Sequence, residues 1–151
     1  MMGAERAILL VEDEDGDAEL ATRAFIRANI KNPVVRARDG VEVLDYLFAR
    51  SRYAGRDVHD LPLFVLLDLN IPKLNGIRVL EAIRADLRTR HLPVIFLTSS
   101  AEERDRLAAY DHFANSYILK PLDYDKFVEV ASQLTRYWTE LNAAAPLREA
   151  M

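Results

Sequence analysis

Short apolar runs alternate along the chain with segments in which apolar side chains recur every three or four positions. The apolar runs predict strands near 7–12, 34–38, 63–68, 93–97 and 116–119. The periodic segments predict helices near 16–28, 40–50, 76–87, 101–110 and 123–141. Segment 101–110 shows little apolar stripe and is the weakest of the predicted helices. A strand and a helix follow one another five times, which indicates an α/β domain.

The predicted strands differ in how continuously apolar they are. The runs "ILLV", "LFVLL" and "VIFL" of the first, third and fourth strands are typical of strands covered on both faces, whereas "VVRAR" alternates and indicates an edge strand. Right-handed crossovers then give a doubly wound parallel sheet of flavodoxin-like order 2-1-3-4-5. In that order the first and third strands are neighbours, and ligands bind at the carboxyl ends of the strands beside this switch point.

Length and composition limit the possible functions. With 151 residues, half of them hydrophobic, we expect one domain over 1–142 and a flexible tail over 143–151. The net charge of −4 and the lack of a Lys/Arg-rich run argue against a nucleic-acid partner. Without cysteine, the chain forms neither disulfides nor thiolate metal sites. The first apolar run is too short for a membrane anchor, so we expect a cytoplasmic protein.

Charged and polar residues follow four of the five predicted strands. Glu12 and Asp13 come after the first strand, Asp68 after the third, Thr98 after the fourth and Lys120 after the fifth. Each has an ordinary explanation when taken separately, such as a solvated loop or a helix cap. Together, at the edge where the fold places ligands, they predict a functional site.

The carboxylates at this edge require a cation. Two carboxylates ~4 Å apart repel by about 4 kcal/mol at an effective dielectric near 20. An oxygen-only site that retains water molecules suits Mg²⁺, for which Mn²⁺ could substitute. We expect Asp13 and Asp68 to be direct ligands, Glu12 to act through water, and the backbone carbonyl of Asn70 to complete the protein's share.

Next to such a metal ion, Asp68 can act as a nucleophile and form an aspartyl phosphate. The ammonium of Lys120 and the hydroxyl of Thr98 are suited to hold the phosphoryl oxygens. Pro121 is a candidate for a cis peptide bond that would direct Lys120 inward. In the loop "NIPKLNG", Gly76 is expected to adopt a positive φ where the third helix begins.

These residues resemble the receiver domain of two-component response regulators. The resemblance covers about residues 7–141 and rests on "ED" after the first strand, "LLDLNIPKLNG", "LTSS" and "YILKP", in the family's order and spacing. It implies that Asp68 is the phosphoacceptor, that a sensor histidine kinase is the donor, and that Thr98 and Tyr117 form a switch. It also implies a regulatory protein that catalyses only its own phosphorylation and dephosphorylation. It signals through conformational change and protein contacts.

Two further sequence features, less specific than these motifs, resemble one group of regulators within that family. The connection "RSRYAGRDVHDLP" and the ending "LTRYWTEL" are similar to those of small regulators paired with bacterial phytochrome kinases. Tyr137 and Trp138 are adjacent, so one helical stripe cannot bury both, and the outward ring is a candidate contact for a homodimer or a kinase.

An aspartate-nucleophile phosphatase is the alternative interpretation of the same residues. Such enzymes use the same metal, hydroxyl and lysine, but they place a second Asp two residues after the nucleophile as an acid and base. Here that position is Asn70, which cannot donate a proton to a leaving group. A flavodoxin is less suitable, because "EDEDGD" after the first strand would repel a flavin phosphate.

Overall fold

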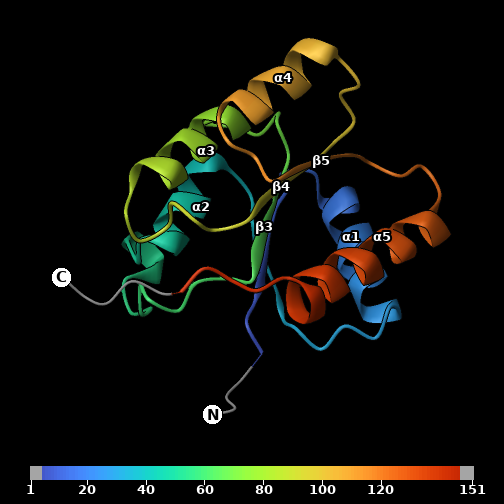
Figure 1. Ribbon diagram of the computed structural model, residues 1–151, viewed down its shortest axis with the longest axis horizontal. Helices are drawn as coiled ribbons and strands as arrows, with labels where there is room; N and C mark the ends of the chain where they lie inside the picture. Colours follow the sequence, from blue (N-terminus) through green and yellow to red (C-terminus); the bar gives the residue numbers. More distant parts are fainter. Residues whose placement is uncertain (1–4, 147–151) are drawn as a thin grey trace.

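A five-stranded parallel sheet lies between two layers of helices in the computed structural model, which describes residues 5–146 (Figure 1). The strand order is β2-β1-β3-β4-β5, which confirms the predicted order. The strands are β1 Ile8–Val11, β2 Val34–Ala37, β3 Phe64–Leu67, β4 Val94–Thr98 and β5 Ser116–Leu119. The helices are α1 Asp15–Arg27, α2 Gly40–Leu47, α3 Gly76–Ala85, α4 Glu103–Asp111 and α5 Tyr124–Arg136, with a 3₁₀ turn at Ser51–Tyr53 and a π turn at Tyr137–Leu141.

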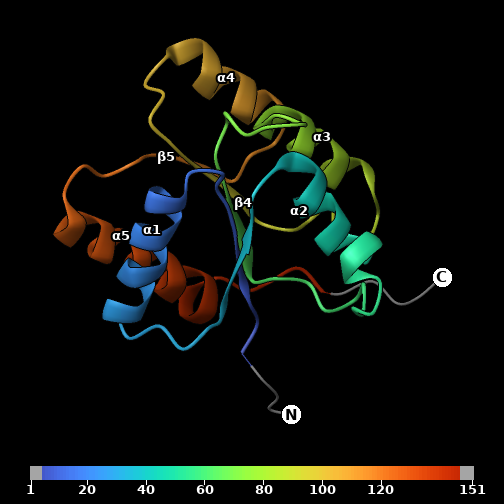
Figure 2. The ribbon, with the colours of Figure 1, turned by 180° about the vertical axis from the view of Figure 1, so that it is seen from behind.

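Each face of the sheet has its own core. Figures 1 and 2 show α1 and α5 on one side of the strands and α2 and α3 on the other. The α1/α5 core contains Phe25 and Phe64, and the α2/α3 core contains Leu80 and Phe96, all at most 1% exposed. Strands β1, β3 and β4 are buried along their whole length, as their apolar runs predict, because helices cover both of their faces.

Side-chain caps define where most of the helices begin. The side chains that accept hydrogen bonds from the first helical N–H groups are Glu14 for α1, Asp39 for α2, Asn75 for α3 and Asp123 for α5. Among the described helices, α4 has no such cap, and Ala109 is its only buried residue. The weak pattern at 101–110 therefore corresponds to a real helix that is loosely attached.

Two predictions about backbone conformation are wrong. The described residues contain no cis peptide bond, so Pro121 is trans. Lys120 points inward because its N–H donates to the carbonyl of Thr98 at 2.8 Å, which extends the pairing of β5 with β4 by one residue. Gly76 does not have a positive φ; within this loop that conformation belongs to Lys73, at 68°. Gly76 is required for another reason, since an added Cβ would lie 2.6 Å from the carbonyl oxygen of Asp68.

The chain beyond α5 is described only in part. The predicted helix 123–141 is observed as α5 followed by the π turn. Of the two aromatic residues in the π turn, Tyr137 is the more exposed, and Trp138 packs against the α1/α5 core. Residues 147–151 of the predicted tail lie outside the described residues. Within 5–146 we find no helix with the length and apolar character needed to cross a membrane.

Candidate phosphoryl-transfer site

The carboxyl ends of β1, β3 and β5 bring opposite charges together. Val11 of β1 pairs with Leu67 of β3, so Glu12 and Asp68 follow at neighbouring positions. Lys120 reaches them from the other side of β4. Three carboxylates accept hydrogen bonds from its ammonium: Glu12 Oε1 at 2.6 Å, Asp68 Oδ2 at 2.9 Å and Asp17 Oδ2 at 3.2 Å. This edge is at the top of the sheet in Figure 1, where α1 begins.

Burial and charge shift the ionisation of this group. Glu12 is 4% exposed, and burial raises the pKa of its carboxyl group even though Lys120 opposes the shift. Burial alone would lower the pKa of Lys120, but hydrogen bonds to Glu12 and Asp68 outweigh it and raise that pKa. Lys120 is therefore a stable cation whose ammonium is shared by three carboxylates.

Asp17 is the site residue that sequence reasoning missed. It belongs to the acidic segment "EDEDGD", which the sequence also allows as a solvated loop. In the structure it occupies the first turn of α1, at the edge where the strands end. Its position four residues after Asp13 was the available signal, because only residues 12–14 separate the end of β1 from the start of α1.

Of the other predicted metal ligands, Asn70 contacts the Asp68 carboxylate. Asp13 follows Glu12 and is exposed at the end of β1. The N–H of Asn70 donates to Asp68 Oδ1 at 3.3 Å, while Lys120 holds Oδ2. Among residues 5–146, no three His, Asp or Glu side chains are arranged as a ready metal cluster. A Mg²⁺ site can instead use two carboxylates, one backbone carbonyl and water.

The two predicted switch residues meet at the loop after β4. Thr98 is fully buried, and its Oγ1 accepts a hydrogen bond from the N–H of Ser100 at 3.3 Å. The hydroxyl of Tyr117 donates to the Ser100 carbonyl at 2.9 Å, and its ring lies 6.1 Å from that of Phe96. The Ser100 hydroxyl donates to Asp105 of α4 at 2.6 Å. One short loop thus connects Thr98, Tyr117 and α4.

The loop after Asp68 is fixed by close backbone contacts. The N–H of Gly76 donates to the Leu69 carbonyl at 2.9 Å, and the N–H of Gly40 donates to the Pro72 carbonyl at 3.2 Å. These contacts attach the start of α2 and the start of α3 to the segment that follows β3. The backbone that follows Asp68 is therefore held in place by the starts of α2 and α3.

Comparison with known proteins identifies the class of this fold and site. Residues 8–132 match the family model of the response regulator receiver domain. The chain therefore belongs to the response regulator receiver family, and it is a regulatory protein of two-component signalling. The resemblance found in the sequence is confirmed.

Three relatives show which members of the family the chain is similar to. It is 39% identical to the probable methanogenesis regulatory protein FilR2 of Methanothrix harundinacea, over 89% of this chain and 84% of that protein. The phosphorylated cyanobacterial phytochrome response regulator RcpA matches with a TM-score of 0.85 and 31% identity, over 95% of this chain and 100% of that chain. The bacteriophytochrome response regulator AtBRR matches with a TM-score of 0.76 and 40% identity, over 93% of this chain and 100% of that chain.

Proposed function

We propose that Asp68 accepts a phosphoryl group from the phosphohistidine of a sensor histidine kinase, in a reaction that depends on Mg²⁺. The observation that supports this role is the position of Lys120, whose ammonium lies 2.9 Å from Asp68 and 2.6 Å from the buried Glu12. A fixed cation beside a carboxylate is suited to receive a transferred phosphoryl group.

The chemistry is a displacement at phosphorus. A carboxylate oxygen of Asp68 forms the new P–O bond while the N–P bond of the phosphohistidine breaks, and the imidazole leaves with the bonding electrons. The ammonium of Lys120 balances the charge on one phosphoryl oxygen. The hydroxyl of Thr98, on the neighbouring strand β4, donates to another.

The metal ion would be held beside Asp68. Asp13, Asp68 and the backbone carbonyl of Asn70 would be its ligands, and Glu12 would contact it through water. Bound Mg²⁺, or Mn²⁺ in its place, neutralises the charge that the phosphoryl group brings into the site. Receiver domains bind Mg²⁺ as a class, and the donors present here fit such an ion.

The response passes through the loop after β4. When Thr98 moves toward the phosphoryl group, the Ser100 N–H that bonds its Oγ1 moves with it. This movement changes the Ser100 carbonyl that Tyr117 holds and the Ser100 hydroxyl that bonds Asp105 of α4. Tyr117 then turns inward, and the α4/β5 surface presents a different shape to a partner protein.

The relatives suggest the upstream partner and the type of output. RcpA and AtBRR are phytochrome response regulators, so we propose a phytochrome-type histidine kinase as the donor. We further propose that the protein works in the cytoplasm and that its activity is limited to its own phosphorylation and dephosphorylation. The exposed Tyr137, in edge-to-face contact with Trp138 at 4.9 Å, is a candidate contact for a homodimer.

Intact mass spectrometry after incubation with acetyl phosphate tests this function. With Mg²⁺ we expect one added phosphoryl group, and with EDTA we expect none. Asp68→Asn should abolish the addition, because the amide is a poor nucleophile of nearly the same shape. Asp111→Asn, at the exposed end of α4, is the matched control and should react like the wild-type protein.

Two outcomes would contradict the proposal. Phosphorylation that survives in Asp68→Asn would place the acceptor elsewhere. Continuous turnover of many small phosphomonoesters, with phosphate released in large excess over protein, would favour the aspartate-nucleophile phosphatase instead.

A further inference from the structure

We propose that Asp17 is the exchangeable partner of Lys120. It holds one N–H of the ammonium while Asp68 is unmodified, and it yields that N–H to a phosphoryl oxygen. This inference rests on the proposed function of Asp68 and adds a residue from α1 to the site. The resemblance to receiver domains implies no role for Asp17.

The ammonium of Lys120 has no unused donor in this structure. A lysine ammonium has three N–H groups, and three carboxylates accept from it here. A phosphoryl group on Asp68 requires one of these donors. One existing hydrogen bond must therefore be given up when the phosphoryl group arrives.

Distance and burial identify the bond that is given up. The Glu12 contact is the shortest at 2.6 Å, and its side chain is 6% exposed, so losing it would leave a buried carboxylate unpaired. The Asp68 contact can pass directly to a phosphoryl oxygen, so a second N–H for the phosphoryl group must come from Glu12 or Asp17. The Asp17 contact is the longest at 3.2 Å, and its side chain is 49% exposed, so water can replace Lys120 at little cost.

The charge of Asp17 gives this exchange a measurable consequence. A phosphoryl group beside Lys120 places negative charge close to the Asp17 carboxylate, and the two repel. Asp17 therefore opposes phosphorylation in two ways, by occupying a donor and by repelling the group that needs it. Removing its charge should stabilise the phosphorylated form.

Binding of beryllofluoride, a stable mimic of a phosphoryl group on a carboxylate, tests the proposal by ¹⁹F NMR titration. Asp17→Asn keeps the side-chain shape, and Asp17→Ala also removes the acceptor. At saturating Mg²⁺ we expect both variants to bind beryllofluoride about two- to fivefold tighter, the change that loss of one partly exposed charge interaction produces. Glu19→Gln removes the same charge from α1 at a residue that pairs with Arg23, and it should leave the affinity unchanged.

Salt separates a charge effect from a change in packing. At about 1 M salt, where charges are screened within about 3 Å, the advantage of Asp17→Asn should largely disappear. Circular dichroism melting checks that each variant is folded at the temperature of the titration.

The possible results lead to different conclusions. An affinity in both Asp17 variants that equals or falls below that of the wild-type protein overturns the inference about Asp17, while the proposed function stands. A wild-type protein that binds no beryllofluoride with Mg²⁺ present overturns the proposed function and, with it, this inference.

Discussion

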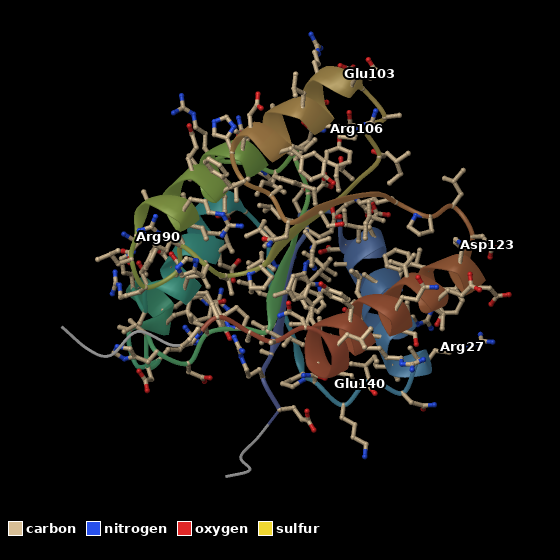
Figure 3. The ribbon with its side chains drawn as sticks, in the orientation of Figure 1. Arg27, Arg90, Glu103, Arg106, Asp123 and Glu140 are labelled. Carbon is tan, nitrogen blue, oxygen red and sulfur yellow. The ribbon has the colours of Figure 1, made fainter. Side chains whose placement is uncertain are left out.

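The β1/β3 half of the site and the α4–β5 half are built differently. Strands β1 and β3 are buried along their whole length, and the loop after β3 is fixed by backbone contacts to α2 and α3. Helix α4 buries only Ala109 and lacks a side-chain cap, and no residue of β5 is fully buried. Figure 3 shows Glu103 at the outermost end of α4, away from the sheet.

This difference separates the proposed phosphoacceptor from the elements proposed to respond, while Lys120 reaches the acceptor from the end of β5. Asp68 and Glu12, which need fixed positions, extend from the tightly packed strands. Tyr117 and Ser100, which must move if the protein is to signal, lie in the loosely packed half. Elements that change conformation are drawn from the less stable parts of a protein, and α4 with β5 fits that description.

Matched leucines give the largest expected contrast between the two halves. Leu80 of α3 is fully buried, whereas Leu107 of α4 is 63% exposed. We expect Leu80→Ala to lower the free energy of unfolding by about 2–5 kcal/mol, because it leaves a cavity in the α2/α3 core. Leu107→Ala should change it by less than about 0.5 kcal/mol. Urea denaturation followed by circular dichroism measures both values, and similar losses would contradict the comparison.

A second contrast uses two glycines. At Gly76 an added Cβ would lie 2.6 Å from the Asp68 carbonyl oxygen and 2.9 Å from Leu69 Cα, whereas at Gly55 nothing lies within 4 Å. We expect Gly76→Ala to cost about 1–3 kcal/mol of stability, as overpacking does. It should also slow phosphorylation by acetyl phosphate, because the backbone of Asp68 must shift. Gly55→Ala is the control, and equal denaturation midpoints for the two variants would count against a close approach at Gly76.

The sequence predicted the sheet well because its signals are local. Continuous apolar runs mark buried parallel strands, and once their order is known the strand ends must share one edge. That reasoning placed Glu12, Asp68 and Lys120 together, and the structure confirms their contact. The weak pattern of the fourth helix also had structural meaning, because α4 has little to bury.

The errors arise where three-dimensional contacts decide. The role of Gly76 depends on the distance to the Asp68 carbonyl, which no local pattern encodes. Lys120 is directed by pairing with Thr98, so the cis peptide proposed at Pro121 was unnecessary. Asp17 was missed because its segment "EDEDGD" is also explained as a solvated loop, and that explanation is sufficient without a site.

The smallest expected effect concerns a hydrogen bond within the loosely packed half, between Tyr117 of β5 and the loop after β4. The Tyr117 hydroxyl donates to the Ser100 carbonyl at 2.9 Å, and burial raises the pKa of Tyr117. Tyr117→Phe keeps the ring against Phe96 and removes this bond, so we expect a loss of about 0.5–1.5 kcal/mol. Tyr110→Phe, on exposed α4, should have no measurable effect.

Hydrogen exchange distinguishes a local from a global consequence of this change. Because the bond holds a loop rather than the core, amides of residues 99–105 should exchange faster in Tyr117→Phe, while those of β1 and β3 should keep their protection relative to the variant's own stability. Faster exchange throughout β1 and β3, beyond the measured loss of stability, would show that the two halves unfold together. The separation between a rigid chemical half and a mobile responding half would then be wrong.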